Sequence, residues 1–417
     1  MNHNTPVLPG DESSAAFTVT ATGEFASLRT GWDELVRAMQ RPSPFLLHGW
    51  LSAWIRHYVK EGELRVHVVR RNGELVGALP LFVTRRRGLR VAQFLGASQS
   101  ALADMLLAPG SDDDVAATLV RLALESRHDF ADLFGLAADS HLAAAHGPAR
   151  LQLIERVEAP VLDLSPGFDA VYRAKTSSKR RNLHGRRLRQ LGELGELRFA
   201  VARTPEELSA ALEHAFTLHN LRWSGRPDGS GFATEQGMRF HREAIVALAE
   251  LDIPRIITLE LDGRPIAFHY YFSLCGRMYV HRLAFDPALS RLSPGAVTTL
   301  EALRVASDEG LRRVEFLGGD ERYKLELADG VEPLFQGLGM AATAAGRVAV
   351  AARFQGIAAR KRLKRNETLR RLYFDGFAPT RRFASKLREV ARRSPPAAPA
   401  VSPTRETDDQ EHRRASL

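Results

Sequence analysis

Cysteine is almost absent from this sequence: its 417 residues include only Cys275. One cysteine cannot form an internal disulfide or supply a cysteine-based zinc or iron–sulfur site. We therefore expect no disulfide scaffold, no metal site and a reducing compartment. Because Cys275 stands in Leu274-Cys-Gly276 with no adjacent base, we expect a buried small hydrophobe at a strand end or turn.

Long apolar runs and a secretory leader are also absent. No segment approaches the roughly 18 uninterrupted apolar residues of a membrane-spanning helix. The first 14 residues include Asp11 and Glu12 and show no basic region followed by an apolar one. These absences favour a cytoplasmic protein, and its length favours more than one core, since single cores stop growing beyond roughly 250–300 residues.

Positive charge is unevenly distributed. The chain has 58 Lys and Arg against 49 Asp and Glu, a net charge of +9. Residues 341–417 alone carry +11 and residues 173–189 carry +8 with no acidic residue, which leaves −10 for the rest. A uniformly basic chain would indicate nucleic acid or anionic membranes as partners. Here an acidic body carries two basic segments.

An internal repeat indicates the fold. Residues 65–79 align without a gap onto residues 255–269, and both read as β-hairpins with Asn72-Gly73 or Asp262-Gly263 turns. Each copy continues with a helical stretch and a short strand, at 115–125 and 130–136 or at 296–306 and 313–317. The pattern predicts an α/β protein built from two copies of one mixed-sheet unit.

Other segments predict the remaining organisation. Helices are expected at 178–194, which is basic, and from Thr204 as N-cap to Trp223. A long strand is expected at 277–285. Basic helices are expected at 350–375 and 381–393, and disorder in the tail. The domain boundaries that follow are 1–15, 16–165, 166–340, 341–393 and 394–417.

Several motifs in the second copy resemble the GNAT-type acyltransferases of the CelD/BcsL branch, which is associated with cellulose and exopolysaccharide biosynthesis. The resemblance covers about residues 30 to 330. It rests on Ser178-Lys-Arg-Arg-Asn182, Leu218-His-Asn-Leu-Arg-Trp223, Tyr279-Val-His-Arg-Leu-Ala-Phe-Asp286, Leu292-Ser-Pro-Gly295 and Glu315-Phe-Leu-Gly-Gly-Asp-Glu-Arg-Tyr-Lys324. It implies a tandem GNAT fold with a degenerate first unit and an acyltransferase second unit.

The resemblance also implies the donor site. Acetyl-CoA or another acyl-CoA would lie along strand 279–285, at Leu283, Ala284 and Phe285, with its pyrophosphate on the N–H groups of loop 290–296. The residues assigned to that loop are Arg291, Ser293, Pro294, Gly295 and Ala296. A helix N-terminus favours an anion. Read locally, Ser-Pro-Gly equally well just starts a helix.

Direct acyl transfer needs a general base and an acid. His281 is the first candidate base, because it lies on the donor strand and histidine titrates near neutral pH. Alternation places its side chain with those of Tyr279 and Leu283. Glu321 is the alternative base, Tyr323 the acid, and Asp320 and Lys324 substrate contacts. The alternatives are a hydrogen-bonded strand residue for His281 and a solvated turn for the Asp-Glu-Arg run.

Four further residues are candidates for the acceptor side. Arg222 and Trp223 could bind a sugar or carboxylate, or could pin the following loop by packing. His269 and Tyr271 share a strand face and could line the acceptor cleft or belong to the core.

The expected activity is acyl transfer to an amine or hydroxyl of a sugar or envelope precursor, with no metal. Two alternatives stay open: a Fem-type transferase that uses aminoacyl-tRNA through the basic helix, and a non-catalytic accessory protein of polysaccharide synthesis. The basic residues 350–393 suit peripheral contact with anionic lipids. Nucleic acid is thus a secondary expectation.

Overall fold

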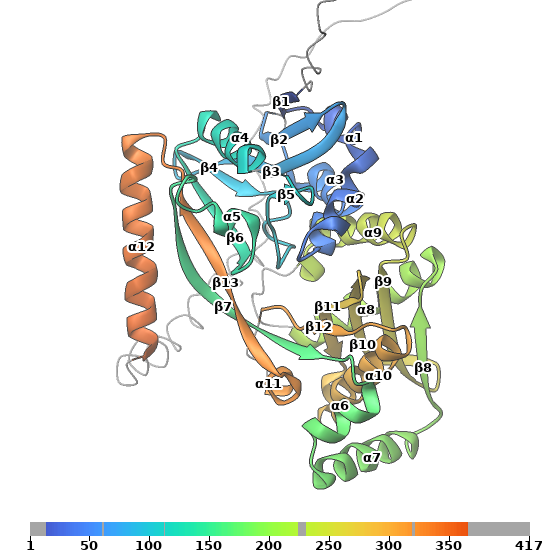
Figure 1. The fold of residues 1–417 in the computed structure, drawn as a ribbon. Coiled ribbons are helices and arrows are strands. Elements are labelled where there is room, and N and C mark those ends of the chain that lie inside the picture. Colours follow the sequence, from blue (N-terminus) through green and yellow to red (C-terminus); the bar gives the residue numbers. More distant parts are fainter. Residues whose placement is uncertain (1–13, 61, 112, 224–230, 319–321, 366–417) are drawn as a thin grey trace, which may run out of the picture. The chain divides into compact units, whose positions relative to one another are not determined.

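The computed structural model describes residues 14–60, 62–111, 113–223, 231–318 and 322–365. The chain divides into two compact units, residues 1–352 and 353–417. The first unit contains the sheet and the candidate site (Figure 1).

Thirteen strands are found in the described part of the chain, and they form one mixed sheet. Twelve of them follow the order β1-β2-β3-β4-β6-β13-β7-β12-β11-β10-β9-β8, with β5 beside β3. The strands are β1 Ser14–Val19, β2 Leu64–Arg71, β3 Glu74–Arg86, β4 Leu89–Phe94, β5 Leu106–Leu107, β6 Phe130–Ala137, β7 Leu151–Asp163, β8 Leu197–Ala202, β9 Pro254–Leu261, β10 Arg264–Leu274, β11 Arg277–Phe285, β12 Arg313–Glu315 and β13 Gly330–Gly339.

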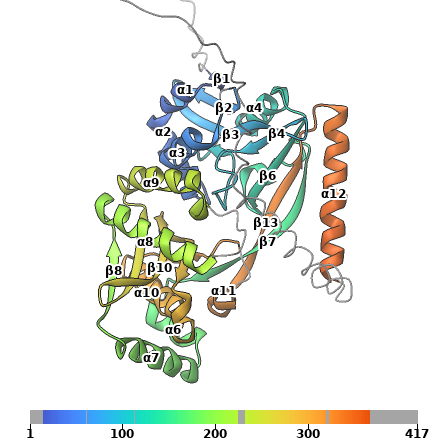
Figure 2. The same cartoon turned by 180° about the vertical axis from the view of Figure 1, so that it is seen from behind.

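This order contains the predicted repeat. Strands β1, β2, β3, β4 and β6 of the first half correspond in order and pairing to β8, β9, β10, β11 and β12 of the second. The last strand of each half crosses over: β7 pairs with β12, and β13 pairs with β6. Strands β7 and β13 also pair with each other along most of their length, as Figure 2 shows from behind. The two halves therefore share one sheet.

Helices cover both faces of the sheet. Against the second half pack α8 and α10, and α4 packs on β2 and β3. Helices α3 and α9, from different halves, pack against each other. The α-helices are α1 Thr22–Ala26, α2 Arg29–Ala38, α3 His48–Tyr58, α4 Asp113–Glu125, α5 His141–Ala144, α6 Phe168–Lys175, α7 Ser178–Gly192, α8 Pro205–Trp223, α9 Glu235–Ala249, α10 Pro294–Asp308, α11 Arg322–Leu327 and α12 Ala344–Arg365; the 3₁₀ turns are η1 Pro44–Leu46, η2 Gly231–Ala233 and η3 Pro287–Leu292.

The predicted hairpin turns and the predicted N-cap at Thr204 are confirmed. Asn72 and Asp262 have φ of 50°, and the glycine after each also has a positive φ, as a type I′ hairpin turn requires. Thr204 accepts a hydrogen bond from the N–H of Glu207 at 3.3 Å, as an N-cap should. The prediction for Cys275 is half wrong: it lies in the β10–β11 turn, but the turn exposes it to solvent.

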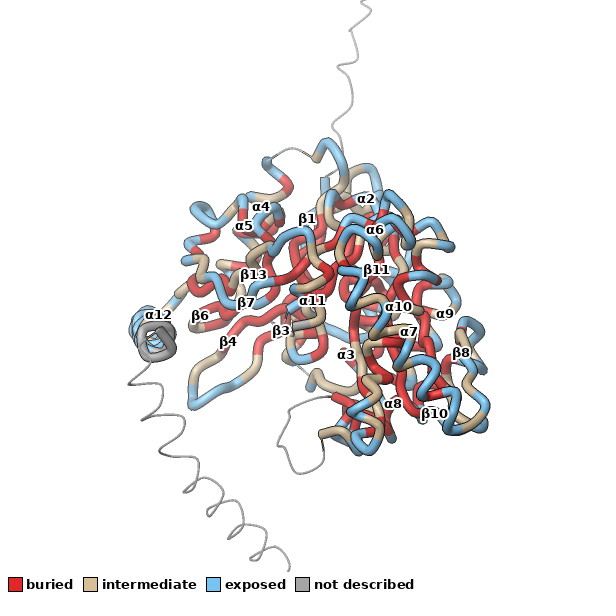
Figure 3. Tube along the Cα trace, turned by 90° about the horizontal axis from the view of Figure 1, so that it is seen from below, coloured by how far each residue is buried: buried red, intermediate tan, exposed pale blue. Residues whose placement is uncertain are grey.

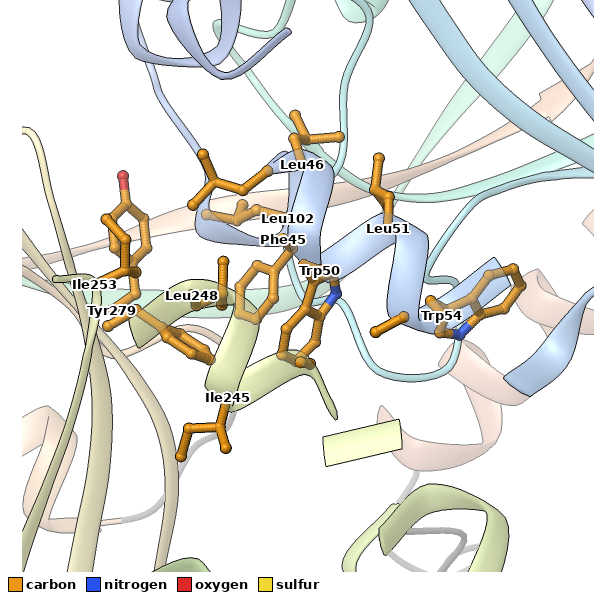
Figure 4. Packing of buried hydrophobic residues seen from close by; sticks show 14 of the residues in the cluster. Phe45, Leu46, Trp50, Leu51, Trp54, Leu102, Ile245, Leu248, Ile253 and Tyr279 are labelled. Atoms are coloured by element: carbon orange, nitrogen blue, oxygen red, sulfur yellow. The ribbon is translucent and has the colours of Figure 1, made fainter. Parts of the chain in front are cut away.

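The largest core cluster joins the two halves. Phe45 and Trp50 from the first half pack with Ile245 and Leu248 of α9 and with Tyr279 of β11 (Figure 4). All five are at most 1% exposed. Since burying one such side chain contributes about 1.5–3 kcal/mol, this contact makes the halves depend on each other for stability.

Helix α12 begins in the first unit and runs into the second. It starts earlier than the predicted helix 350–375. The part of that prediction after residue 365, the expected helix 381–393 and the tail lie outside the described residues. Within the described ranges, no helix combines the length and apolarity needed to cross a bilayer.

Candidate active site

Strands β11 and β12 pair for only three residues and then diverge. The parallel register runs from Arg277 opposite Arg313 to Tyr279 opposite Glu315. Beyond this point β11 continues to Phe285, paired only with β10, whereas β12 ends. The β12-facing edge of β11 after Tyr279 therefore presents backbone groups outside the sheet ladder, which a bound chain of amides could use.

The first half has the same divergence but closes it with its own chain. Strands β4 and β6 pair only at Val91–Phe130 and Ala92–Ala131. The N–H of Ala103 then donates to the carbonyl of Gly135 at 3.1 Å. Gly135 has φ of 96°, and a Cβ there would lie 2.8 Å from the Ala101 carbonyl oxygen. Residues 101–103 therefore lie against β6 where the first half diverges.

Beside the divergence of the second half lies a cavity of about 220 Å³. Helices α6, α7, α10 and α11 and the turn between α6 and α7 contribute its walls, and Figure 1 shows α6 next to α10. The lining residues are Lys175, Thr176, Ser177, Arg180, His184, Ala296, Thr299, Leu300, Tyr323, Glu326 and Leu327. Ala296 and Tyr323 were predicted site residues, and the structure brings them together here.

The predicted phosphate loop forms the start of α10. Ser293 adopts φ of 51°, and Pro294 opens the helix. A Cβ on Gly295 would lie 2.7 Å from the ring of Phe285, so only glycine fits against β11 at this position. The N–H groups of Ala296 and Val297 bond back to the Ser293 carbonyl, at 3.0 and 3.3 Å, so this loop presents fewer free amides than expected.

The cavity has a basic wall, and part of it comes from the basic helix, whose expected roles were to hold coenzyme A's phosphates, to hold an anionic acceptor or to contact RNA. Arg180 forms an ion pair with Glu326 of α11. Lys175 donates to the Ala328 carbonyl at 3.0 Å. The side chain of His184 is 2.9 Å from the Tyr172 hydroxyl, and burial, followed by the charges of Arg180 and a second arginine, lowers its pKa. The basic helix was visible in sequence, but its position over α10 and α11 was not.

Lys324 is buried beside the divergence. It is 6% exposed, and its Nζ donates to the Gly318 carbonyl at 3.3 Å. His269 lies on β10, which pairs with β11, and it is fully buried. Burial together with the charge of Lys324 lowers the pKa of His269 to about 3. Tyr323 packs at the cavity wall near Phe316. Asp320 and Glu321 lie outside the described residues.

His281 lies at a β-bulge in β11, and its side chain is on the face of the sheet opposite to the cavity. Val280 pairs with Tyr271 and Arg282 with Tyr270, which leaves His281 as the extra residue. The bulge reverses the expected alternation: Ala284 joins the core cluster of Tyr279, so the prediction that Leu283 shares the face of His281 is wrong.

Aromatic rings surround His281. Those of Phe45, Trp50, Tyr270 and Phe272 lie within 5.2–5.8 Å of its ring, centroid to centroid. Burial, and then the charge of Arg282, lowers its pKa well below the usual value, so the imidazole is neutral. Its Nε2 has no hydrogen-bond partner among the described residues. The expectation that His281 titrates near neutral pH is therefore wrong: the lowered pKa leaves a neutral ring that accepts a proton less readily than an ordinary histidine.

The predicted acceptor residues separate into two groups. The guanidinium of Arg222 lies 3.9 Å from the ring centre of Phe285 and 5.6 Å from that of Trp223, so Arg222 contacts β11. Tyr271 is fully buried in a hydrophobic cluster, which agrees with the core interpretation. Strands β10 and β11 are mostly buried, whereas α7 is mostly exposed or half-buried (Figure 3).

Comparison with known proteins agrees with this geometry. Residues 178–325 match the family model described as "Acetyltransferase (GNAT) domain". These residues form a GNAT-type acyltransferase domain. The match includes the diverging strands, the start of α10 and α11. No curated protein sequence matches the chain.

Solved structures share the fold of both halves. One is the C-terminal domain of a putative lysylphosphatidylglycerol synthetase from Agrobacterium fabrum, with TM-score 0.50 and 12% identity over 81% of this chain and 96% of that one. Another is FemX, with TM-score 0.51 and 12% identity over 77% and 96%. A third, from Bacteroides thetaiotaomicron, has unknown function, with TM-score 0.50 and 11% identity over 77% and 99%. At this identity they show a shared fold alone. The family match over residues 178–325 and the repeat of its strand order in the first half indicate two GNAT-type units in tandem.

Metal ligands are not gathered at this site. In the part of the chain that the structure describes, no group of three or more His, Cys, Asp or Glu side chains could hold an ion.

Proposed function

We propose that this protein transfers an acyl group, in the simplest case acetyl, from an acyl-CoA to an amine or hydroxyl of a sugar or envelope precursor in exopolysaccharide synthesis. The observation that carries the proposal is the divergence of β11 from β12 beside the cavity at the start of α10. The donor would bind with its amides along β11 beyond Tyr279 and its phosphates near Arg180, Lys175 and the first turn of α10.

The chemistry is direct transfer. The acceptor nitrogen or oxygen forms a bond to the thioester carbonyl carbon, and the carbon–sulfur bond breaks. The acceptor proton passes to a base, for which neutral His281 is the candidate, and the leaving thiolate takes a proton from an acid, for which Tyr323 at the cavity wall is the candidate. The two lie on opposite faces of the sheet, so the reacting carbonyl would sit at the divergence between them.

Calorimetric titration with acetyl-CoA tests the donor. We expect binding by the wild-type protein and loss of binding in Leu300→Trp, because the indole would fill the cavity that Leu300 lines. The matched control is Leu188→Trp on the exposed side of α7, 39% exposed, which should bind normally. Absence of wild-type binding at millimolar acetyl-CoA would overturn the proposed donor.

Aminoacyl-tRNA is the second candidate donor, and the basic helix α7 favours it. Helix α7 contains no acidic residue, and it lines the cavity. Its basic residues include Lys179, Arg186, Arg187 and Arg189. An RNA donor predicts binding that weakens steeply with salt, with a smaller salt slope after Arg186→Gln and Arg187→Gln. RNA binding unchanged by these substitutions would count against this candidate.

We also propose that the protein is cytoplasmic and contacts anionic membranes through α12 and the basic residues after it, up to 393. Val348 and Phe354 are exposed large hydrophobic residues on this helix, at 70% and 38%, and Arg347 and Arg353 stand beside them. Such a helix binds anionic lipid through both charge and apolar contact. Sedimentation with phosphatidylglycerol vesicles should be lost after Val348→Glu and Phe354→Glu, whereas unchanged sedimentation would contradict the proposal.

A further inference from the structure

The side chain of Gln99, from the first half, contacts a buried histidine cluster of the GNAT domain that contains His241 and His281. Its Oε1 accepts a hydrogen bond from Nε2 of His241 on α9, at 3.3 Å, and its Nε2 donates to the Tyr58 hydroxyl at 3.4 Å. The ring of His241 lies 5.4 Å from that of His281, centroid to centroid. Gln99 is 6% exposed and His241 is fully buried. The chain therefore places an amide from one half against a histidine pair of the other.

The loop that carries Gln99 is fixed on both sides. Its own turn is closed by bonds from the N–H groups of Gln99 and Ser100 to the Gly96 carbonyl, at 2.7 and 2.9 Å. The indole N–H of Trp50 donates a hydrogen bond to the Ser100 hydroxyl at 3.1 Å. On the opposite side, a Cβ on Gly231 would lie 2.3 Å from the side-chain oxygen of Gln99, so a larger residue there would force the amide to move.

Polar atoms in this cluster lack partners although they are buried. Nδ1 of His241, Nε2 of His281 and the hydroxyl of Tyr270 have no hydrogen-bond partner among the described residues. All three residues are at least nine-tenths buried. Leaving such groups unsatisfied destabilises the folded state, so a native structure keeps them for a reason, such as a bound polar group. The cluster thus has the properties of a binding site rather than of ordinary core.

The amide of Gln99 selects the tautomer of His241. An amide oxygen only accepts hydrogen bonds, so Nε2 of His241 carries the proton and Nδ1 carries the lone pair. Burial, then the charge of Arg282 and the neighbouring His219, lowers the pKa of His241 well below its usual value, which keeps the ring neutral. The titratable and charged groups around the pair are Arg282, His219, Tyr58 and Tyr270.

We propose that Gln99 is a positioning residue for acyl transfer: it holds His241 in one neutral tautomer beside His281, so the first half completes the proton-accepting side of the GNAT domain's site. This inference rests on the proposed function, since it assigns the acceptor side of that same reaction. It also gives the first half a role in the reaction, although its own donor position is closed by residues 101–103.

The test combines Gln99→Met, which keeps the length of the side chain but removes the acceptor, with Gln99→Glu, which keeps an acceptor and adds charge. We expect Gln99→Met to lower kcat about tenfold or more, with KM for acetyl-CoA within about twofold. In Gln99→Glu the carboxylate stabilises protonated His241, so the low-pH limb of the kcat profile should move to higher pH. The matched control is Gln93→Met, also a buried glutamine of the first half, 8% exposed, which should keep the wild-type profile.

A second readout does not depend on turnover. Long-range ¹H–¹⁵N correlation spectra of histidine-labelled protein report which ring nitrogen carries the proton. We expect the Nε2–H form for His241 in the wild type and a changed tautomer signal in Gln99→Met. Wild-type kcat and pH profile in Gln99→Met, or an Nδ1–H form in the wild type, would overturn the proposal. If acetyl-CoA does not bind the wild type at all, the proposed function fails, and the tautomer measurement still decides the arrangement of Gln99 and His241.

Discussion

The carboxylate of Glu315 on β12 and the guanidinium of Arg277 on β11 lie 2.7 Å apart. Both residues belong to the three-residue stretch in which β11 and β12 still pair. Arg313 reaches the same carboxylate at 2.7 Å, and Arg41 of the first half contacts it at 3.6 Å. Glu315 is only 1% exposed. One buried carboxylate therefore binds arginines from both halves of the protein at the point where β11 and β12 begin to diverge.

Glu315→Gln should destabilise the first unit strongly. Arg41 and Arg313 keep Glu332 as a second carboxylate, but the charge-assisted hydrogen bond from Arg277 is weakened, so the loss should be about 1.5–3 kcal/mol. Urea unfolding followed by circular dichroism measures this loss. The control is Glu250→Gln, whose pair with Arg29 is exposed and should contribute about 1 kcal/mol or less. Equal losses in the two variants would contradict a special role for Glu315.

Features set by neighbouring residues were predictable from the sequence. The hairpin at Asp262-Gly263 follows from residues that tolerate positive φ, and β11 begins and ends where the apolar pattern predicts. The exposure of Cys275 was missed, because sequence gives the turn but not whether another segment covers it. The reversed face after His281 was missed as well, since one extra residue in a strand has no signal in alternation.

Features set by distant segments were not predictable. The crossing of β7 and β13 joins each half's last strand to the other half, and the pairing partners are more than 100 residues apart in sequence. The cavity wall likewise depends on how α7 folds back toward α11, through Arg180 and Glu326. Motifs placed Ala296 and Tyr323 at the site, because both belong to the second copy, but the contribution of Gln99 needed the three-dimensional contact.

Gly135→Ala should destabilise the protein by about 1–3 kcal/mol. The position has φ of 96°, which costs any L-residue energy, and the new Cβ would meet the Ala101 carbonyl at 2.8 Å. Thermal or urea unfolding measures the effect. Gly147→Ala is the matched control, because a Cβ there meets nothing within 4 Å. A neutral effect at Gly135 would show that the 101–103 segment does not press against β6.

Cys275 should react with N-ethylmaleimide in the folded protein, with one adduct per chain by mass spectrometry. The residue is exposed in the β10–β11 turn, and burial of part of its surface raises the pKa of its thiol, so the reaction should speed up with pH. Cys275→Gly should fold normally and remove the adduct, because the position has φ of 47° and glycine adopts it without strain. A thiol that reacts only in denaturant would contradict the exposed turn.

His269 makes the stability of the protein depend on pH. Burial and the charge of Lys324 lower its pKa to about 3, whereas an unfolded histidine titrates near 6.5. Between these values the unfolded state binds a proton that the folded state does not. Stability is therefore lost as the pH falls below about 6.5, and this residue contributes a slope of up to about 1.4 kcal/mol per pH unit.

Replacing His269 by glutamine should remove this contribution. Between pH 7.5 and 5.5, the wild type should lose about 1.4 kcal/mol more unfolding free energy than His269→Gln, because the other histidines titrate in both proteins. Tyr271→Phe is the matched control: it changes a buried residue on the same strand, and burial raises the pKa of its phenol, so it cannot titrate in this range. Urea unfolding at the two pH values measures each difference, and equal pH dependence in wild type and His269→Gln would mean that His269 is protonated in the folded state.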